Sequence, residues 1–251
     1  MSSSRTARAG RTPSSAGAAR RRDHRTDSVV SGIAVALGCL LFLGGFAWGA
    51  ITYQPYTVPT DSMAPTVGAG DRVLAERTDG ADVRRGDVVV FKDKAWGDLP
   101  MVKRVVAIGG DTVTCCDKQQ RIKVNGKAIT EPYVDGAQRE GQDGFPAVKV
   151  PEGKLFLLGD HRADSLDSRE HLSNAAKGSV ARDAVRGRVE GTVWPLGGAG
   201  TLEPAEGFAG LPGGVTERGP LRLIVWAVFG GAVMILGGAA YGPVARRIRG
   251  R

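Results

Sequence analysis

Residues 101–111 read MVKRVVAIGGD, a β-branched stretch that ends in a Gly-Gly-Asp turn signal. Valine and isoleucine favour extended backbone, whereas paired glycines followed by aspartate favour a turn. Alternate residues of a strand share a face, so Lys103 points with Met101 and Val105, and Arg104 points the opposite way. The stretch therefore predicts a strand that sets a lysine on an apolar face.

Similar short stretches lie on both sides of this strand. The strand described above spans residues 102–108. The other stretches occupy residues 72–75, 87–91, 112–114, 121–124 and 154–158. Turn signals bound them, and Asn125-Gly126 between two such stretches is typical of a two-residue hairpin. Short strands at this spacing predict a mainly β fold, an antiparallel β-barrel or sandwich.

Two uncharged apolar runs flank the predicted β segment. Residues 29–51 form a run of 23, and residues 223–241 form a run of 19. A transmembrane helix needs about 20 apolar residues, whereas the apolar part of a cleaved signal peptide has about 7–15. The alternative for the second run is a buried core helix. We expect an uncleaved transmembrane helix at 29–51 and a second one at 221–241.

The basic charge of the chain belongs to its two ends. The 251 residues carry a net charge of +8, which would fit a nucleic-acid-binding protein. However, residues 1–28 hold +5 and residues 242–251 hold +4, which leaves −1 for everything between them. The folded part is not basic, and we expect no nucleic acid as a partner.

This charge distribution also predicts a topology. Basic residues that flank transmembrane helices stay on the cytoplasmic side, so both ends are expected there. Residues 1–28, poor in large apolar side chains, are expected to be a disordered cytoplasmic tail, and 242–251 a second basic tail. Residues 52–196 then form an extracytoplasmic β-rich domain, and the Gly/Pro-rich segment 197–220 is expected to be a linker.

The cysteines indicate neither a metal site nor a cofactor. Cys39 lies in the first apolar run, and Cys115 and Cys116 are adjacent. Metal-ligating pairs are usually spaced by two to four residues, so we expect no metal and no cofactor. Neighbouring cysteines fit disulfide geometry poorly, which favours two free thiols and leaves a strained disulfide as the alternative.

A serine between two prolines is the first candidate for catalysis. Residues 59–66 read PTDSMAPT, with Ser62 held on a stiff turn. By itself this pattern favours a turn serine bonded to its own backbone. A nucleophilic serine needs a base. Of the three histidines, His24 lies in the cytoplasmic tail, which leaves His161 and His171.

Lys103 is the other candidate base. Lysine has an ordinary pKa of about 10.4, and burial on an apolar face would lower it towards the range of about 7–8 that suits a base. The alternative is a lysine that reaches water from the edge of a sheet. Residues 159–169, GDHRADSLDSR, follow an apolar strand and offer hydroxyls, carboxylates and guanidiniums that could orient a buried lysine.

Taken together, these segments resemble type I signal peptidases, membrane-bound serine/lysine endopeptidases related to self-cleaving repressors. Four segments match the family motifs in order, at residues 59–66, 84–91, 103–111 and 159–169. The resemblance covers residues 52–195. It implies the β catalytic core of that family, with residues 112–154 as a reduced cap insertion.

The resemblance also implies roles for single residues. Ser62 would be the nucleophile and Lys103 the general base, with the Ser62 amide and the Thr60 hydroxyl forming the oxyanion hole. Ser165 matches the serine that hydrogen-bonds the base, and His161 replaces an asparagine at a structural position. Structural support of the site would come from Asp160, Arg162, Asp167, Arg169 and Arg104. Of these, Asp167 and Arg169 would form an ion pair.

The implied activity is removal of signal peptides from exported preproteins at the membrane surface. The resemblance implies an Ala-x-Ala preference, contact with the lipid bilayer and proximity to the export translocon, and Met63 would help to seat the catalytic face on the bilayer. Two rivals remain open: a self-cleaving repressor, which would need a DNA-binding segment, and an anchored β-domain without catalytic activity.

Overall fold

The computed structural model describes residues 15–140 and 142–249, which fall into two compact units. Residues 49–221 form one unit. The other combines the segments before residue 49 and after residue 221, and each unit is described by itself.

The helical unit consists of the two apolar runs. Helix α1 spans Ser15–Thr52 and helix α3 spans Leu221–Arg249. Ser28–Thr52 and Leu221–Tyr241 are long and apolar enough to cross a membrane. Of the tail that we expected to be disordered, residues 1–14 lie outside the described residues, and residues 15–28 belong to α1.

Glycines allow α1 and α3 to approach each other closely. A Cβ on Gly38 would lie 2.8 Å from the carbonyl oxygen of Gly231, and one on Gly45 would lie 3.0 Å from Val228. Further along, Ser31 Oγ donates a hydrogen bond of 2.6 Å to Gly238 O. Rising residue numbers in one helix meet falling numbers in the other, so the helices pack antiparallel. Small residues at such contacts are typical of packed membrane helices.

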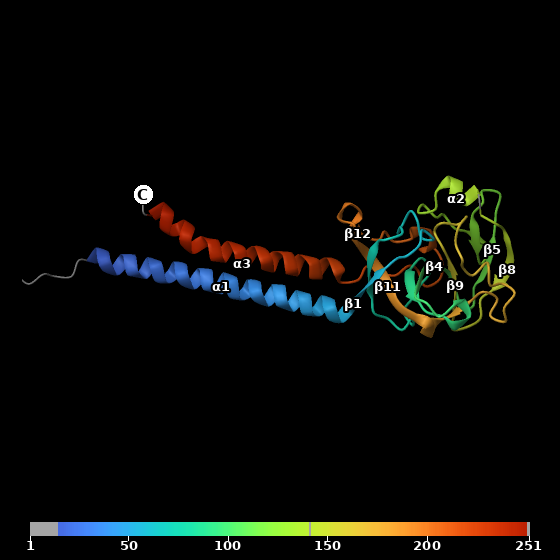
Figure 1. Cartoon of the computed structure of the whole chain (residues 1–251), viewed down its shortest axis with the longest axis horizontal. Helices are drawn as coiled ribbons and strands as arrows, with labels where there is room; N and C mark the ends of the chain where they lie inside the picture. The colour runs from blue at the N-terminus through green and yellow to red at the C-terminus, as the bar shows by residue number, and fades with distance from the viewer. Residues whose placement is uncertain (1–14, 141, 250–251) are drawn as a thin grey trace, which may run out of the picture. The chain divides into compact units, whose positions relative to one another are not determined.

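The β unit is built around one curled antiparallel sheet (Figure 1). Its strands run in the order β1-β2-β11-β3-β4-β9-β10, with β12 paired to β11. Their bounds are β1 Tyr53–Thr57, β2 Arg72–Glu76, β3 Val88–Phe91, β4 Met101–Ile108, β9 Lys154–Leu158, β10 Val180–Ala181, β11 Val185–Trp194 and β12 Gly200–Thr201. The predicted mainly β, antiparallel fold is confirmed.

A second, smaller sheet lies within the predicted cap insertion. It has the order β7-β6-β5-β8, from β5 (Thr112–Cys115), β6 (Ile122–Val124), β7 (Lys127–Ala128) and β8 (Phe145–Lys149), and the short helix α2 (Gly136–Glu140) precedes β8. The predicted hairpin is present. Asn125 and Gly126 have φ of 54° and 80°, the left-handed values that a tight two-residue turn requires.

Strand β4 is buried on both of its faces. Every residue from Val102 to Ala107 is buried, so both faces of the strand are covered. Val102 packs with the turn that follows β1, Val105 with Leu155 and Leu157, and Val106 with the smaller sheet. A lysine and an arginine in this strand are therefore enclosed by protein on both faces.

The segment expected to be a linker is part of the folded domain. It carries the 3-10 turns Leu196–Gly198 and Glu206–Phe208, and Ala205, Phe208 and Leu211 are buried against the smaller sheet. The expectation from Gly and Pro content was wrong because a few spaced apolar side chains suffice to dock the segment. We call residues 202–218 the strap.

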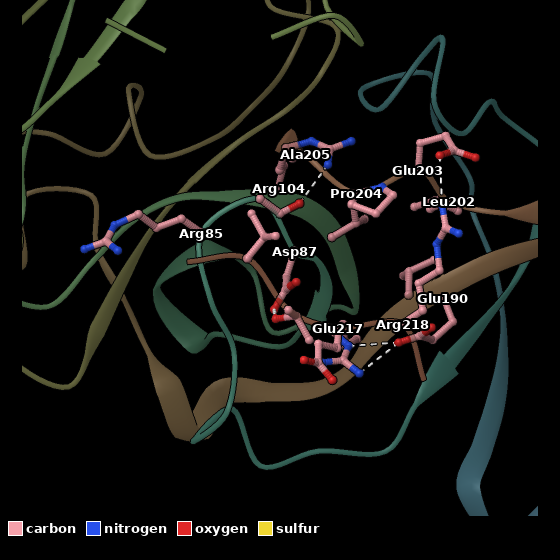
Figure 2. A pocket seen from close by; sticks show the side chains of 16 residues that line it. Arg85, Asp87, Arg104, Glu190, Leu202, Glu203, Pro204, Ala205, Glu217 and Arg218 are labelled. Carbon is pink, nitrogen blue, oxygen red and sulfur yellow. Dashed lines mark hydrogen bonds and ion pairs between the residues drawn. The ribbon is translucent and has the colours of Figure 1, made fainter. Parts of the chain in front are cut away.

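Polar contacts fasten the strap as well. Arg85 Nη1 donates to Pro212 O at 2.7 Å, and Thr216 Oγ1 donates to the Asp87 carboxylate at 2.8 Å. Figure 2 shows the small pocket left between the strap and the sheet, with Asp87 inside it and the Glu203–Arg218 ion pair beside it. Burial raises the pKa of Asp87 from its ordinary value.

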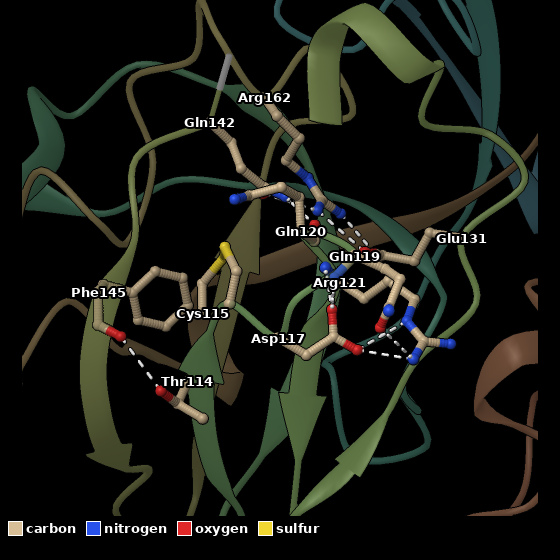
Figure 3. The surroundings of a disulfide bond; sticks show 11 residues. Thr114, Cys115, Asp117, Gln119, Gln120, Arg121, Glu131, Gln142, Phe145 and Arg162 are labelled. Carbon is tan, nitrogen blue, oxygen red and sulfur yellow. Dashed lines mark hydrogen bonds and ion pairs between the residues drawn. A yellow bond between two sulfur atoms is a disulfide. The ribbon is translucent and has the colours of Figure 1, made fainter. Parts of the chain in front are cut away.

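The two adjacent cysteines are joined. A disulfide links Cys115 and Cys116 at the end of β5, close to Phe145 (Figure 3). The expectation of two free thiols was wrong, since the two neighbouring sulfur atoms are bonded to each other. Cys39 is a free thiol.

Candidate active site

Ser62 lies on a turn between β1 and β2 that the core holds in place. Ala64 N donates to Asp61 O at 2.8 Å, and Val67 N donates to Met63 O at 3.0 Å. Met63 and Val67 are wholly buried on either side of the turn. The serine is thus presented on an anchored loop, and Met63, buried in the core, is not available to contact a bilayer.

Lys103 reaches Ser62 from strand β4. Lys103 pairs with Val89 of β3 and is only 3% exposed. Its Nζ lies 2.6 Å from Ser62 Oγ, across 41 residues of sequence. A hydroxyl and an amine at this separation share a hydrogen bond through which a proton can pass.

The surroundings of Lys103 favour its neutral form. Burial lowers the pKa of Lys103 to about 8, because removal from water penalises the ammonium. The carboxylates of Asp167 and Asp160 raise this pKa, and the guanidinium of Arg169 lowers it further. Desolvation outweighs the carboxylates, so a fraction of the lysines is unprotonated near neutral pH.

Thr60 places a second hydroxyl beside the serine. Its Oγ1 lies 3.2 Å from Ser62 Oγ, within hydrogen-bonding distance. The Ser62 amide N–H has no acceptor in the part of the chain that the structure describes. A free amide and a neighbouring hydroxyl are the donors that can stabilise a developing oxyanion.

The loop 159–169 closes against the serine turn. His161 N donates to Ser62 O at 3.2 Å, and the His161 ring Nδ1 lies 3.2 Å from Asp61 O. The imidazole therefore faces the backbone of the turn, whereas the hydroxyl of Ser62 faces Lys103. His171 lies elsewhere, stacked on Trp96 at 4.4 Å.

Asp160 joins this loop to strand β4. Arg104 donates to both carboxylate oxygens of Asp160, from Nε at 2.8 Å and from Nη2 at 2.6 Å. Thr66, four residues after the serine, adds a hydrogen bond of 2.6 Å to the same carboxylate. Both charges are fully buried, so the pair fixes the loop relative to the serine turn.

Asp167 and Arg169 fix the loop from within. Arg169 donates from Nε and Nη2 to the two oxygens of Asp167, each at 2.9 Å. The amide of Gly159 also donates to Asp167, at 3.0 Å. Arg162 Nε donates to Gly159 O at 3.0 Å, so Gly159 is held at both its amide and its carbonyl.

Ser165 lies near the serine without bonding the lysine. Its Oγ is buried and has no hydrogen-bond partner in the described structure, whereas the expected partner, Lys103 Nζ, bonds Ser62 instead. A Cβ on Gly159 would collide with both Ser165 Oγ and Ser62 O. Ser165 therefore packs against the residues that touch the nucleophile, without the hydrogen bond that the family motif implies.

Comparison with known proteins settles the family. A family model described as signal peptidase, peptidase S26, matches residues 28–194. Signal peptidase I of Bacillus licheniformis is 36% identical over 141 residues, 53% of this chain and 74% of the relative. This chain belongs to the signal peptidase family. It is accordingly a serine peptidase.

Further relatives agree. Signal peptidase I S of Bacillus subtilis is 37% identical over 139 residues, 51% of this chain and 73% of the relative. A signal peptidase I crystal structure from Enterococcus faecalis V583 matches 42% of this chain and 94% of its own chain. That match has 27% identity and a TM-score of 0.35.

Three residues near the site of this signal peptidase were missed by sequence reasoning. Thr66 binds Asp160, and Glu131 and Tyr133, from the loop between β7 and α2, contact Arg162 and Arg104. Thr66 stands within the serine motif and could have been found there. The Glu-Pro-Tyr run at 131–133 follows the predicted hairpin, but Glu131 is one of several carboxylates in residues 112–154, so no sequence signal singled it out.

Proposed function

We propose that this chain cleaves signal peptides from exported preproteins, with Ser62 as nucleophile and Lys103 as general base. The observation that carries the proposal is the 2.6 Å separation of Lys103 Nζ and Ser62 Oγ in a buried site. The names of the relatives supply the substrate class.

The first step forms an acyl-enzyme. Neutral Lys103 takes the proton of the Ser62 hydroxyl as the oxygen attacks the scissile carbonyl. The peptide bond breaks, and its nitrogen accepts from Lys103 the proton that came from Ser62. The mature protein leaves with a free amine. The signal peptide remains joined to Ser62 as an ester.

The second step releases the signal peptide. Lys103 removes a proton from a water molecule, which attacks the ester carbonyl, and Ser62 recovers its proton as the ester bond breaks. In both steps the carbonyl oxygen carries negative charge. The Ser62 amide and the Thr60 hydroxyl are the donors placed to stabilise it.

A buried apolar cluster supports the turn that carries Ser62. Val58, Met63 and Val102 belong to this cluster, and all three are buried. An extended substrate would pair with a strand edge beside this turn. The Ala-x-Ala preference that the family resemblance implies stays a prediction.

We also propose that Ser28–Thr52 and Leu221–Tyr241 both span the membrane, with the two ends of the chain in the cytoplasm. Antiparallel packing of α1 and α3 and the arginines at both ends of the chain support this topology. The catalytic domain then lies on the outer side, where it would meet preproteins close to the export translocon.

The test is cleavage of a preprotein by full-length enzyme in detergent. We expect Ser62→Ala and Lys103→Ala to abolish release of the mature protein. An anchored β-domain without catalytic activity predicts no cleavage by the wild type, and full activity in both variants would refute the dyad.

A further inference from the structure

A buried carboxylate from the loop between β7 and α2 contacts an arginine of the loop 159–169. Glu131 is 2% exposed and accepts from Arg162 at 2.5 Å on one oxygen and at 3.0 Å on the other. Gln142 Oε1 accepts a third hydrogen bond from Arg162, at 3.3 Å. Figure 3 shows Arg162, Glu131 and Gln142 converging on one another.

The same carboxylate is linked to the second site arginine. Tyr133 donates its hydroxyl hydrogen to Glu131 Oε1 at 2.8 Å. The Arg104 guanidinium carbon lies 3.8 Å from the centre of the Tyr133 ring, a cation–π contact. Glu131 and Tyr133 thus contact both arginines, one by an ion pair and the other by a cation–π contact.

These arginines fix the backbone that touches the nucleophile. Arg162 binds Gly159 O, and Arg104 binds the Asp160 carboxylate. The next residue, His161, donates its amide hydrogen to Ser62 O at 3.2 Å. Because a Cβ at Gly159 would strike Ser62 O, the loop has little room to move toward the turn.

We propose that Glu131 is a positioning residue for Ser62, acting through Arg162 and the backbone of residues 159–161. The inference rests on the proposed role of Ser62 as nucleophile. The segment between β7 and α2 is then a support that sets the nucleophile against its base.

Stability alone is a weak reason for such a pair. Two charges removed from water bear a desolvation penalty, and a well-packed apolar pair of similar volume is often as stable or more so. The position of the reacting atoms matters more to catalysis, since a displacement of such an atom by about 1 Å can reduce the rate about 100-fold.

The decisive variant is therefore the double substitution Glu131→Leu with Arg162→Met, studied in the full-length enzyme in detergent. We expect it to fold, as thermal unfolding will show, and to lose 10- to 100-fold in kcat on a peptide with an Ala-x-Ala cleavage site, with KM within about two-fold. Glu131→Gln is expected to lose as much kcat, with lower stability.

The pH profile gives an independent readout. Lys103 is buried and faced by Asp160, Asp167 and Arg169, all three of which belong to the loop 159–169. A loosened loop admits water and returns the lysine towards its ordinary pKa. We therefore expect the acid limb of kcat/KM to move to higher pH in both variants.

The matched control is Asp117→Asn. Asp117 and Arg121 form an ion pair of 2.7 Å in the turn between β5 and β6, where both are partly exposed and both also bond Gln119. This variant should keep wild-type kcat and pH profile.

Wild-type kcat in the folded double variant would overturn the inference, as would its failure to fold, which would give the pair a role in folding. Cleavage by Ser62→Ala would instead refute the proposed nucleophile, so the two failures are distinguishable.

Discussion

Lys103 Nζ lies 2.6 Å from Ser62 Oγ, although the two side chains come from a turn after β1 and from the centre of β4. The lysine is enclosed by the sheet, whereas the serine is partly exposed on its turn. The pair thus combines a buried amine with a partly exposed hydroxyl, which is the arrangement that the proposed roles of base and nucleophile require.

The activity should depend on pH through Lys103. With a pKa of about 8, the lysine is mostly protonated below that pH and cannot accept the serine proton. We expect kcat/KM to rise with pH and to level off above about pH 8 to 9. A pH–rate profile in detergent checks this, and a midpoint near the ordinary histidine pKa of about 6.5 would point to His161 instead.

Replacement of the lysine should stabilise the fold at neutral pH. Because the folded-state pKa lies below the unfolded value, the unfolded chain binds the proton more tightly, and wild-type stability rises as the pH passes from about 8 towards 10.5. Lys103→Met should therefore gain about 1–3 kcal/mol in the free energy of unfolding at pH 7.

The difference in the free energy of unfolding between Lys103→Met and the wild type should narrow above pH 8, because the wild type becomes more stable there. Chemical denaturation in detergent at pH 7 and pH 9.5 measures it. A gain that is equal at both pH values would mean that the lysine is not desolvated.

Thr60 should act through its hydroxyl. Thr60→Val keeps the shape and removes the donor beside Ser62, and loss of one oxyanion donor costs about 10²–10³ in kcat. Thr60→Ser keeps the donor and serves as the control, with near wild-type kcat expected. Equal rates for the valine and serine variants would remove Thr60 from the oxyanion hole.

The strap should behave as part of the domain. Phe208 is wholly buried against the smaller sheet, so Phe208→Ala should destabilise the fold by about 3–5 kcal/mol. Leu196, 75% exposed, lies just before the strap, and Leu196→Ala should stay within about 0.5 kcal/mol of the wild type. Thermal unfolding of both variants tests whether residues 202–218 are folded or only connect elements.

The hairpin at Asn125-Gly126 was predictable because its turn chemistry is complete in two residues. The period of two in residues 101–108 places Lys103 among apolar residues, and burial then implies a lowered pKa. That local pattern did not decide a role for Lys103 or for Ser62, and both roles came from the resemblance of four ordered segments to a known family.

Other parts depend on contacts that are distant in sequence. β11 escaped prediction because Gly187 and Gly191 interrupt its pattern, yet both are needed. A Cβ on Gly187 would lie 2.8 Å from Glu76 O, and one on Gly191 would collide with Gly200 O. The roles of Glu131 and Phe208 likewise arise only when separate segments pack together.

The most direct measurement is identification of the residue that carries the acyl group. Full-length enzyme is mixed with preprotein, quenched in acid, digested and analysed by mass spectrometry. The account predicts a signal-peptide ester on Ser62 in the wild type and none in Lys103→Met. An ester on another residue, such as Ser165, or an unchanged Ser62 ester in the lysine variant would contradict it.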